Sequence, residues 1–127
     1  MNKLLFYADF LAYRNSGFAR TGLSYKAIDY GPVPERWDRV YSQFDEIIQE
    51  PRSYGDKEGS VLVTSADADL SIFTSEELHV LDQVCARFAD CSSSEMTRIS
   101  HDESAWIDYV KGYERISFDS AFKLRAI

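Results

Sequence analysis

The segment from Tyr30 to Pro34 constrains the fold of this chain more than any other, because two prolines enclose a valine directly after a glycine. Each proline fixes its own φ and pushes the residue before it out of the α region. Gly31 supplies the backbone freedom that a turn into this segment needs. Pro34 stands where the first turn of a helix accepts a proline. The sequence therefore predicts a rigid joint between an extended segment and a helix, whose apolar stripe is Trp37, Val40, Tyr41, Phe44, Ile47 and Ile48.

Two other blocks accompany this segment, and the three together carry a family resemblance. Lys3–Ala8 reads KLLFYA, Tyr30–Val33 reads YGPV, and His101–Trp106 reads HDESAW. In this order and rough spacing the blocks resemble those of the Panacea, or SocA-like, antitoxin domain, and the resemblance covers nearly the whole chain. Phe6 stands where tyrosine is frequent in that family. Ala105 stands where proline is usual, so the turn of the third block is expected to be looser.

The resemblance implies an antitoxin that neutralises a co-encoded toxin by direct protein–protein binding. Members of the family bind toxins of many unrelated folds, and at least one type acts as an adaptor that hands its toxin to a cellular protease. A DNA-binding module often precedes the domain in relatives. We therefore expect residues 1–127 to form a single domain that itself binds no nucleic acid. Whether this domain is one part of a longer protein is left open. Whether the toxin is blocked or degraded, and whether the domain forms a homodimer, are left open. An accessory protein of a phage or mobile element that binds a host protein is an alternative.

The composition favours one globular domain and a protein partner. The chain has 127 residues, is 45% hydrophobic, and contains eight tyrosines, eight phenylalanines and two tryptophans. Its net charge of −7 disfavours duplex DNA or RNA as the main ligand and suits a basic protein. Cys85 and Cys91 form no C-x-x-C pair, and a zinc site would need His79 and His101 at spacings of no familiar finger. We expect two reduced thiols in a cytoplasmic protein, since neither a leader nor an apolar run long enough for a membrane span is present.

Periodicity and turn signals predict a mainly helical α+β fold, with about five or six helices and a small antiparallel sheet of two or three short strands. The first helix should run from Asn2, its candidate cap, to Ser16–Gly17. Capping boxes at Thr74–Glu77 and Ser92–Glu95 should open two further helices. The remaining predictions are a strand within 21–30, a loop over 51–59, a strand over 60–64, a short helix from Asp102 that carries Trp106, and an edge strand from Ile116.

The candidate partner-binding residues come from the three blocks and the helix after the joint. Large aromatic side chains dominate binding hot spots, although they are more often found in cores. The candidates are Tyr7, Asp9, Tyr30, Gly31, Pro32, Val33, Trp37, His101 and Trp106. Five tyrosines of the first half are further predicted to line one groove: Tyr13, Tyr25, Tyr30, Tyr41 and Tyr54.

Asp9 is unusual because it lies inside an apolar helix, where a buried carboxylate needs a partner. We expect either a place at the exposed edge of the helix or an ion pair, for which the candidate cations are Arg14, Lys26 and Arg39.

His101 supports the alternative function, a small hydrolase or metal-dependent enzyme. A histidine beside Asp102 and Glu103 can act as a general base. The structural alternative is that it caps the preceding helix or packs beside Trp106. No glycine-rich phosphate loop, nucleophile elbow or paired-carboxylate signature is present. We therefore expect no catalytic residue, no cofactor and no metal.

Overall fold

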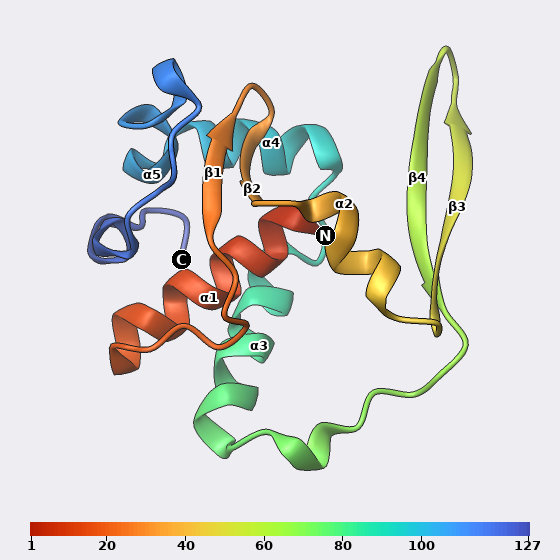
Figure 1. Ribbon diagram of the computed structural model, residues 1–127, viewed down its shortest axis with the longest axis horizontal. Helices are drawn as coiled ribbons and strands as arrows, with labels where there is room; N and C mark the ends of the chain where they lie inside the picture. Colours follow the sequence, from red (N-terminus) through yellow and green to blue (C-terminus); the bar gives the residue numbers. More distant parts are fainter. The chain divides into compact units, whose positions relative to one another are not determined.

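The computed structural model describes residues 1–127 and confirms the mainly helical α+β class (Figure 1). The chain divides into two units, one formed by residues 1–35 and 73–127 and the other by residues 36–72. The α-helices are α1 (Asn2–Ser16), α2 (Trp37–Val40), α3 (Ser75–Phe88), α4 (Ser93–His101) and α5 (Ser104–Ile107). Short 3-10 helices are η1 (Tyr41–Gln43), η2 (Leu70–Ile72), η3 (Val110–Gly112) and η4 (Phe118–Lys123). The strands are β1 (Tyr25–Ile28), β2 (Gly31–Pro34), β3 (Ile47–Tyr54) and β4 (Lys57–Thr64), paired as two separate antiparallel hairpins.

The first unit is built around α1, which contacts β2, α3 and η4. Phe6, Phe10 and Leu11 are fully buried, and the Phe10 ring stacks on that of Phe118 at 4.6 Å between centroids. A helix that is apolar on most sides is stable only when other elements cover it, as they do here. The predicted end is confirmed, because Gly17 adopts φ 77° and its N–H donates to the Tyr13 carbonyl at 2.7 Å. The helix begins at Asn2, but the capping prediction is wrong: the cap residue is Met1 instead of Asn2, and no side chain caps this end.

The predicted joint after Pro34 takes a different form. Pro34 ends β2 instead of opening a helix, and Arg36 adopts a positive φ of 56° before α2 begins. The predicted helical stripe is wrong beyond η1, because Phe44 is extended and Ile47 and Ile48 belong to β3. The helical spacing was not a sufficient signal here. No residue from 36 to 72 is buried, so no packing against a core stabilises a longer helix.

The second unit contains the β3–β4 hairpin, which replaces the loop predicted over 51–59. The ladder runs from Tyr54↔Lys57 to Ile47↔Thr64, so the strand predicted over 60–64 is confirmed as part of β4. Gly55 adopts φ 64° at the first central position of a two-residue turn, which is the type II′ geometry that fits the twist of a hairpin. The Tyr54 ring lies over Gly59, within 3.3 Å of where a β-carbon would stand, and this contact helps to hold the register.

The later helices follow the sequence signals closely. Both capping boxes are present: Thr74 and Glu77 exchange hydrogen bonds at the start of α3, and Ser92 and Glu95 do so at the start of α4. The predicted edge strand from Ile116 is wrong, because the tail makes one isolated bridge at Arg115 and then coils into η4. No helix combines the length and apolar character needed to cross a membrane.

Candidate partner-binding site

The three sequence blocks meet in the first unit. Gly31, with φ 114°, lies so close to α4 that a β-carbon there would stand 2.5 Å from Ser100 Oγ and 2.9 Å from Lys3 Cε. Trp106 Nε1 donates to the Ile28 carbonyl at 2.7 Å. The hairpin β1–β2 is thereby held between the first helix and the third block, and we call this meeting of residues 3–8, 28–34 and 100–106 the block junction.

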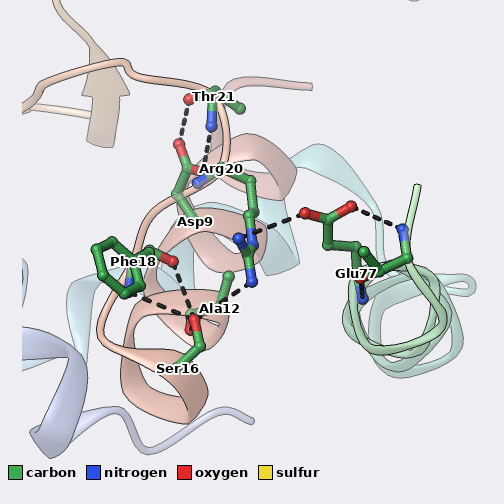
Figure 2. Close-up of polar contacts among 8 residues, drawn as sticks. Asp9, Ala12, Ser16, Phe18, Arg20, Thr21 and Glu77 are labelled. Atoms are coloured by element: carbon green, nitrogen blue, oxygen red, sulfur yellow. Dashed lines mark hydrogen bonds and ion pairs between the residues drawn. The ribbon is translucent and has the colours of Figure 1, made fainter. Parts of the chain in front are cut away.

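Asp9 is fully buried and joins α1 to the segment after it. Its Oδ1 accepts the backbone N–H groups of Arg20 at 2.8 Å and Thr21 at 3.0 Å (Figure 2). Its Oδ2 accepts the Tyr25 hydroxyl at 2.7 Å and also the Thr21 hydroxyl. A carboxylate with several donors is satisfied without a cation. The predicted ion pair and the predicted exposed position are therefore both wrong.

Glu103 is a second buried carboxylate and lies in the junction, whereas from the sequence it was identified only as an acidic neighbour of His101. Its Oε1 accepts the Tyr7 hydroxyl at 3.2 Å and the Ala126 N–H at 3.0 Å, and its Oε2 accepts the Arg125 N–H at 2.9 Å. Tyr7 is fully buried. Burial, followed by the charge of Glu103, raises the pKa of the Tyr7 hydroxyl far above its usual range. No local signal distinguished Glu103, because the neighbouring acid Asp102 is exposed and only Ala105 among the other residues of this block is buried.

This pair predicts an alkaline dependence of stability. The folded chain keeps the Tyr7 proton at a pH where the unfolded chain releases it, so Tyr7 lowers stability above about pH 10, by about 1.4 kcal/mol per pH unit. Tyr7→Phe removes one hydrogen bond and should be less stable than the wild type at about pH 9. That deficit should shrink or reverse at about pH 11, measured by urea unfolding at each pH. A deficit of constant size across this range would contradict the expected proton release.

His101 stacks on Trp106, with ring centroids 3.8 Å apart and planes 14° from parallel. Its Nε2 is buried without a hydrogen-bond partner. Glu103 already accepts hydrogen bonds from Tyr7, Arg125 and Ala126. No group of three His, Cys, Asp or Glu residues is placed so that it could hold a metal ion. The geometry matches the packing role that was the structural alternative for His101.

One side of the junction reaches solvent at the turn between β1 and β2. The Tyr30 side chain is 73% exposed, whereas the next four residues, which form β2, are all buried. Beside it the Tyr113 hydroxyl donates to Asp29 Oδ1 at 2.7 Å, and this bond raises the pKa of Tyr113. Asp29, Tyr30 and Tyr113 form what we call the turn surface.

The other predicted site residues are divided between core and second unit. Tyr7, Asp9, Gly31, Pro32 and Val33 are buried, and Trp106 and His101 are half-buried. Trp37 is exposed but belongs to the second unit. The predicted tyrosine groove is wrong at Tyr25, whose ring is fully buried against Phe6 and Phe10.

A second feature of the first unit is an apolar cavity of about 230 Å³ between α1 and α3. Arg20 reaches from the loop after α1 to Glu77 on α3, with 3.3 Å between Nη1 and Oε1 (Figure 2). Glu77 also accepts the Thr74 N–H, so one carboxylate both caps α3 and pairs with Arg20. The apolar residues that line this cavity are Leu5, Ala8, Phe73, Val80 and Leu81.

Comparison with known proteins gives one match. The family model described as antitoxin SocA-like, Panacea domain, matches residues 1–107 of this chain. No curated protein and no solved structure matches it. The matched range contains all three blocks and ends just after Trp106, so it excludes Tyr113 and η4.

Proposed function

The chain belongs to the family of SocA-like antitoxins with a Panacea domain, and we propose that it neutralises a co-encoded toxin by binding it directly. In this proposal the chain acts through an interface and not as an enzyme. Delivery of the bound toxin to a cellular protease is part of the same proposal, as is a cytoplasmic location, where the toxin would meet its target.

The observation that supports this proposal most is the exposure of Tyr30 on a turn whose backbone is held by the core. Gly31 and Pro32 are buried directly beside it, and Trp106 anchors the Ile28 carbonyl before it. A side chain held in place before binding loses little conformational freedom on binding. Tyrosine and tryptophan are also the residues most enriched in binding hot spots. The turn surface is therefore the contact that we propose in the first unit.

The charge of the chain fits a basic toxin. A net charge of −7 would accelerate the encounter with a basic protein and disfavour acidic competitors. A stable complex would bury about 1,200–2,000 Å² in total, so the turn surface would form only part of the interface.

Co-expression tests the proposed function. The product of the open reading frame next to the gene is expressed alone and together with this chain, and growth is measured. Growth arrest by the neighbour alone and recovery with this chain are expected. Continued arrest in the presence of soluble, abundant chain would contradict the proposal.

Tyr30→Ala should weaken toxin binding about 10- to 30-fold, measured by calorimetry with an inactive variant of the neighbour's product. Phe18→Ala is the matched control, because Phe18 is an aromatic residue with 69% exposure outside the turn surface. Both variants should keep the wild-type unfolding temperature. Equal affinity of the two variants would remove Tyr30 from the interface.

A further inference from the structure

We propose that the β3–β4 hairpin captures the toxin by strand addition, with the outer edge of β4 pairing with an exposed strand edge of a basic toxin. This inference rests on the proposed antitoxin function and deepens it by naming the mode of recognition. Its support lies entirely within the second unit, residues 36–72.

The hairpin lacks a core of its own. No residue from 36 to 72 is buried, and two-stranded hairpins are at best marginally stable in water. Large apolar side chains are nevertheless displayed on it, with Ile48 56% exposed and Tyr54 58% exposed. A two-stranded sheet also has two unpaired edges, and such edges are templates for another strand.

The two edges are not equivalent, because β3 contains Pro51. In a two-residue hairpin the residues that flank the turn, Tyr54 and Lys57, exchange hydrogen bonds, and the pattern alternates from there. Pro51 pairs with Ser60 three steps along the ladder, at a position whose nitrogen faces away from β4. This is the position in which a strand tolerates proline. The outer edge of β3 therefore lacks one N–H donor.

The edge of β4 is intact. The same alternation directs the N–H groups of Glu58, Ser60 and Leu62 outward, and β4 contains no proline. An added strand would lie beside Val61 and Val63 on one face and Leu62 on the other, because side chains alternate along a strand. Backbone pairing with pockets for alternate side chains is the established logic of strand addition.

Charge selects the occupant of this edge. Residues 36–72 contain eight aspartates and glutamates against four lysines and arginines, a net charge of −4 out of the −7 of the whole chain. More than half of the net charge thus lies in less than a third of the sequence. A second copy of the hairpin would bring like charges together, whereas a basic strand would be attracted. We therefore infer that the strand added to β4 comes from a basic toxin and not from a second copy of this chain.

The test compares two double variants of the full chain against the inactive product of the neighbouring open reading frame. Ser60→Pro with Leu62→Pro removes two outward N–H donors and leaves the donors that face β3. Ser60→Ala with Leu62→Ala is the matched control, which removes the same side chains and keeps both donors. We expect the proline pair to bind 10- to 100-fold more weakly than the alanine pair. Equal affinity would overturn strand addition while leaving the proposed function intact.

Hydrogen exchange supplies a measurement that needs no variant. The backbone amides of Ser60 and Leu62 should exchange rapidly in the free chain and become protected in the complex, while the inward amides of Val61 and Val63 change less. Unchanged exchange at Ser60 and Leu62 in a formed complex would overturn the inference. Sedimentation of the free chain as a dimer that the proline pair dissociates would also overturn it, because a second copy would then cover the edge. Failure of the wild-type chain to bind the neighbour's product or restore growth would remove the proposed function and the inference with it.

Discussion

Asp9→Ala should lower the free energy of unfolding by about 3–5 kcal/mol, the largest effect that we expect from removing one side chain. The substitution leaves four donors without their acceptor, from Arg20, Thr21 and Tyr25. An unsatisfied buried donor costs about 1–3 kcal/mol, and water that enters the site would recover part of the loss. Urea unfolding at neutral pH measures the change.

The variant Asp9→Asn separates the effect of the carboxylate charge on stability from the effect of side-chain size. Asparagine keeps the size but turns an NH₂ donor toward groups that are themselves donors. It should therefore lose stability as well, at about 2 kcal/mol or more. Asp29→Asn is the matched control, because Asp29 also accepts a tyrosine hydroxyl but lies on the surface. A loss at Asp9 no larger than that at Asp29 would show that the four-donor network contributes little.

Gly31→Ala should destabilise the chain by about 2–5 kcal/mol, for two separable reasons. At φ 114° an alanine is strained in any surroundings. Its β-carbon would also stand 2.5 Å from Ser100 Oγ and 2.9 Å from Lys3 Cε, so that the Ser100 hydroxyl, which donates to the Thr97 carbonyl, and the Lys3 side chain must move. Overpacking of this kind costs about 1–3 kcal/mol on its own. Thermal and urea unfolding would both register the loss.

Two comparisons separate the contribution of backbone strain from that of the steric clash in Gly31→Ala. Gly22→Ala places an alanine at a milder positive φ, 74°, close to the left-handed region, where a β-carbon meets nothing within 4 Å, so it should cost less than Gly31→Ala. Combining Gly31→Ala with Ser100→Ala removes the closest clashing atom, and the pair should lose less than the sum of the two single variants. Strict additivity would mean that the approach to Ser100 is not the source of the loss. The remaining sources would then be backbone strain at Gly31 and the approach to Lys3.

The parts of the fold that the sequence predicted are those whose signals are local. The capping boxes at Thr74 and Ser92 are two side chains three residues from their partners, and both formed as expected. The end of α1 at Gly17 is also local, since a left-handed residue closes the last turn. The three blocks were recognised by their order along the chain. Their meeting at Gly31 and Trp106 was not predicted, because it depends on tertiary packing.

The failures have a common physical origin. Apolar residues at Ile47 and Ile48 fit either a helical stripe or a strand, and an element without buried residues offers no core to decide between them. The turn signal at Gly55, followed by aspartate, was available and favoured a hairpin. The prediction of an ion pair at Asp9 failed for a different reason. Two of the four donors to Asp9 are backbone N–H groups, which no pattern of side chains in the sequence reveals.

The division of the chain at Glu35 and Phe73 has a consequence for how such a protein can change. The unit that holds the aromatic core is formed by residues 1–35 and 73–127, and the segment with the hairpin is inserted between these two parts of the sequence. Lengthening or replacing an inserted segment costs little free energy, because the entropic cost of closing a loop grows only slowly with the length of the loop. Residues 36–72 should therefore tolerate substitution and changes of length better than the residues of the first unit. With the hairpin as the toxin-binding element that we propose, the partner-binding part of the chain could change while the core stays the same.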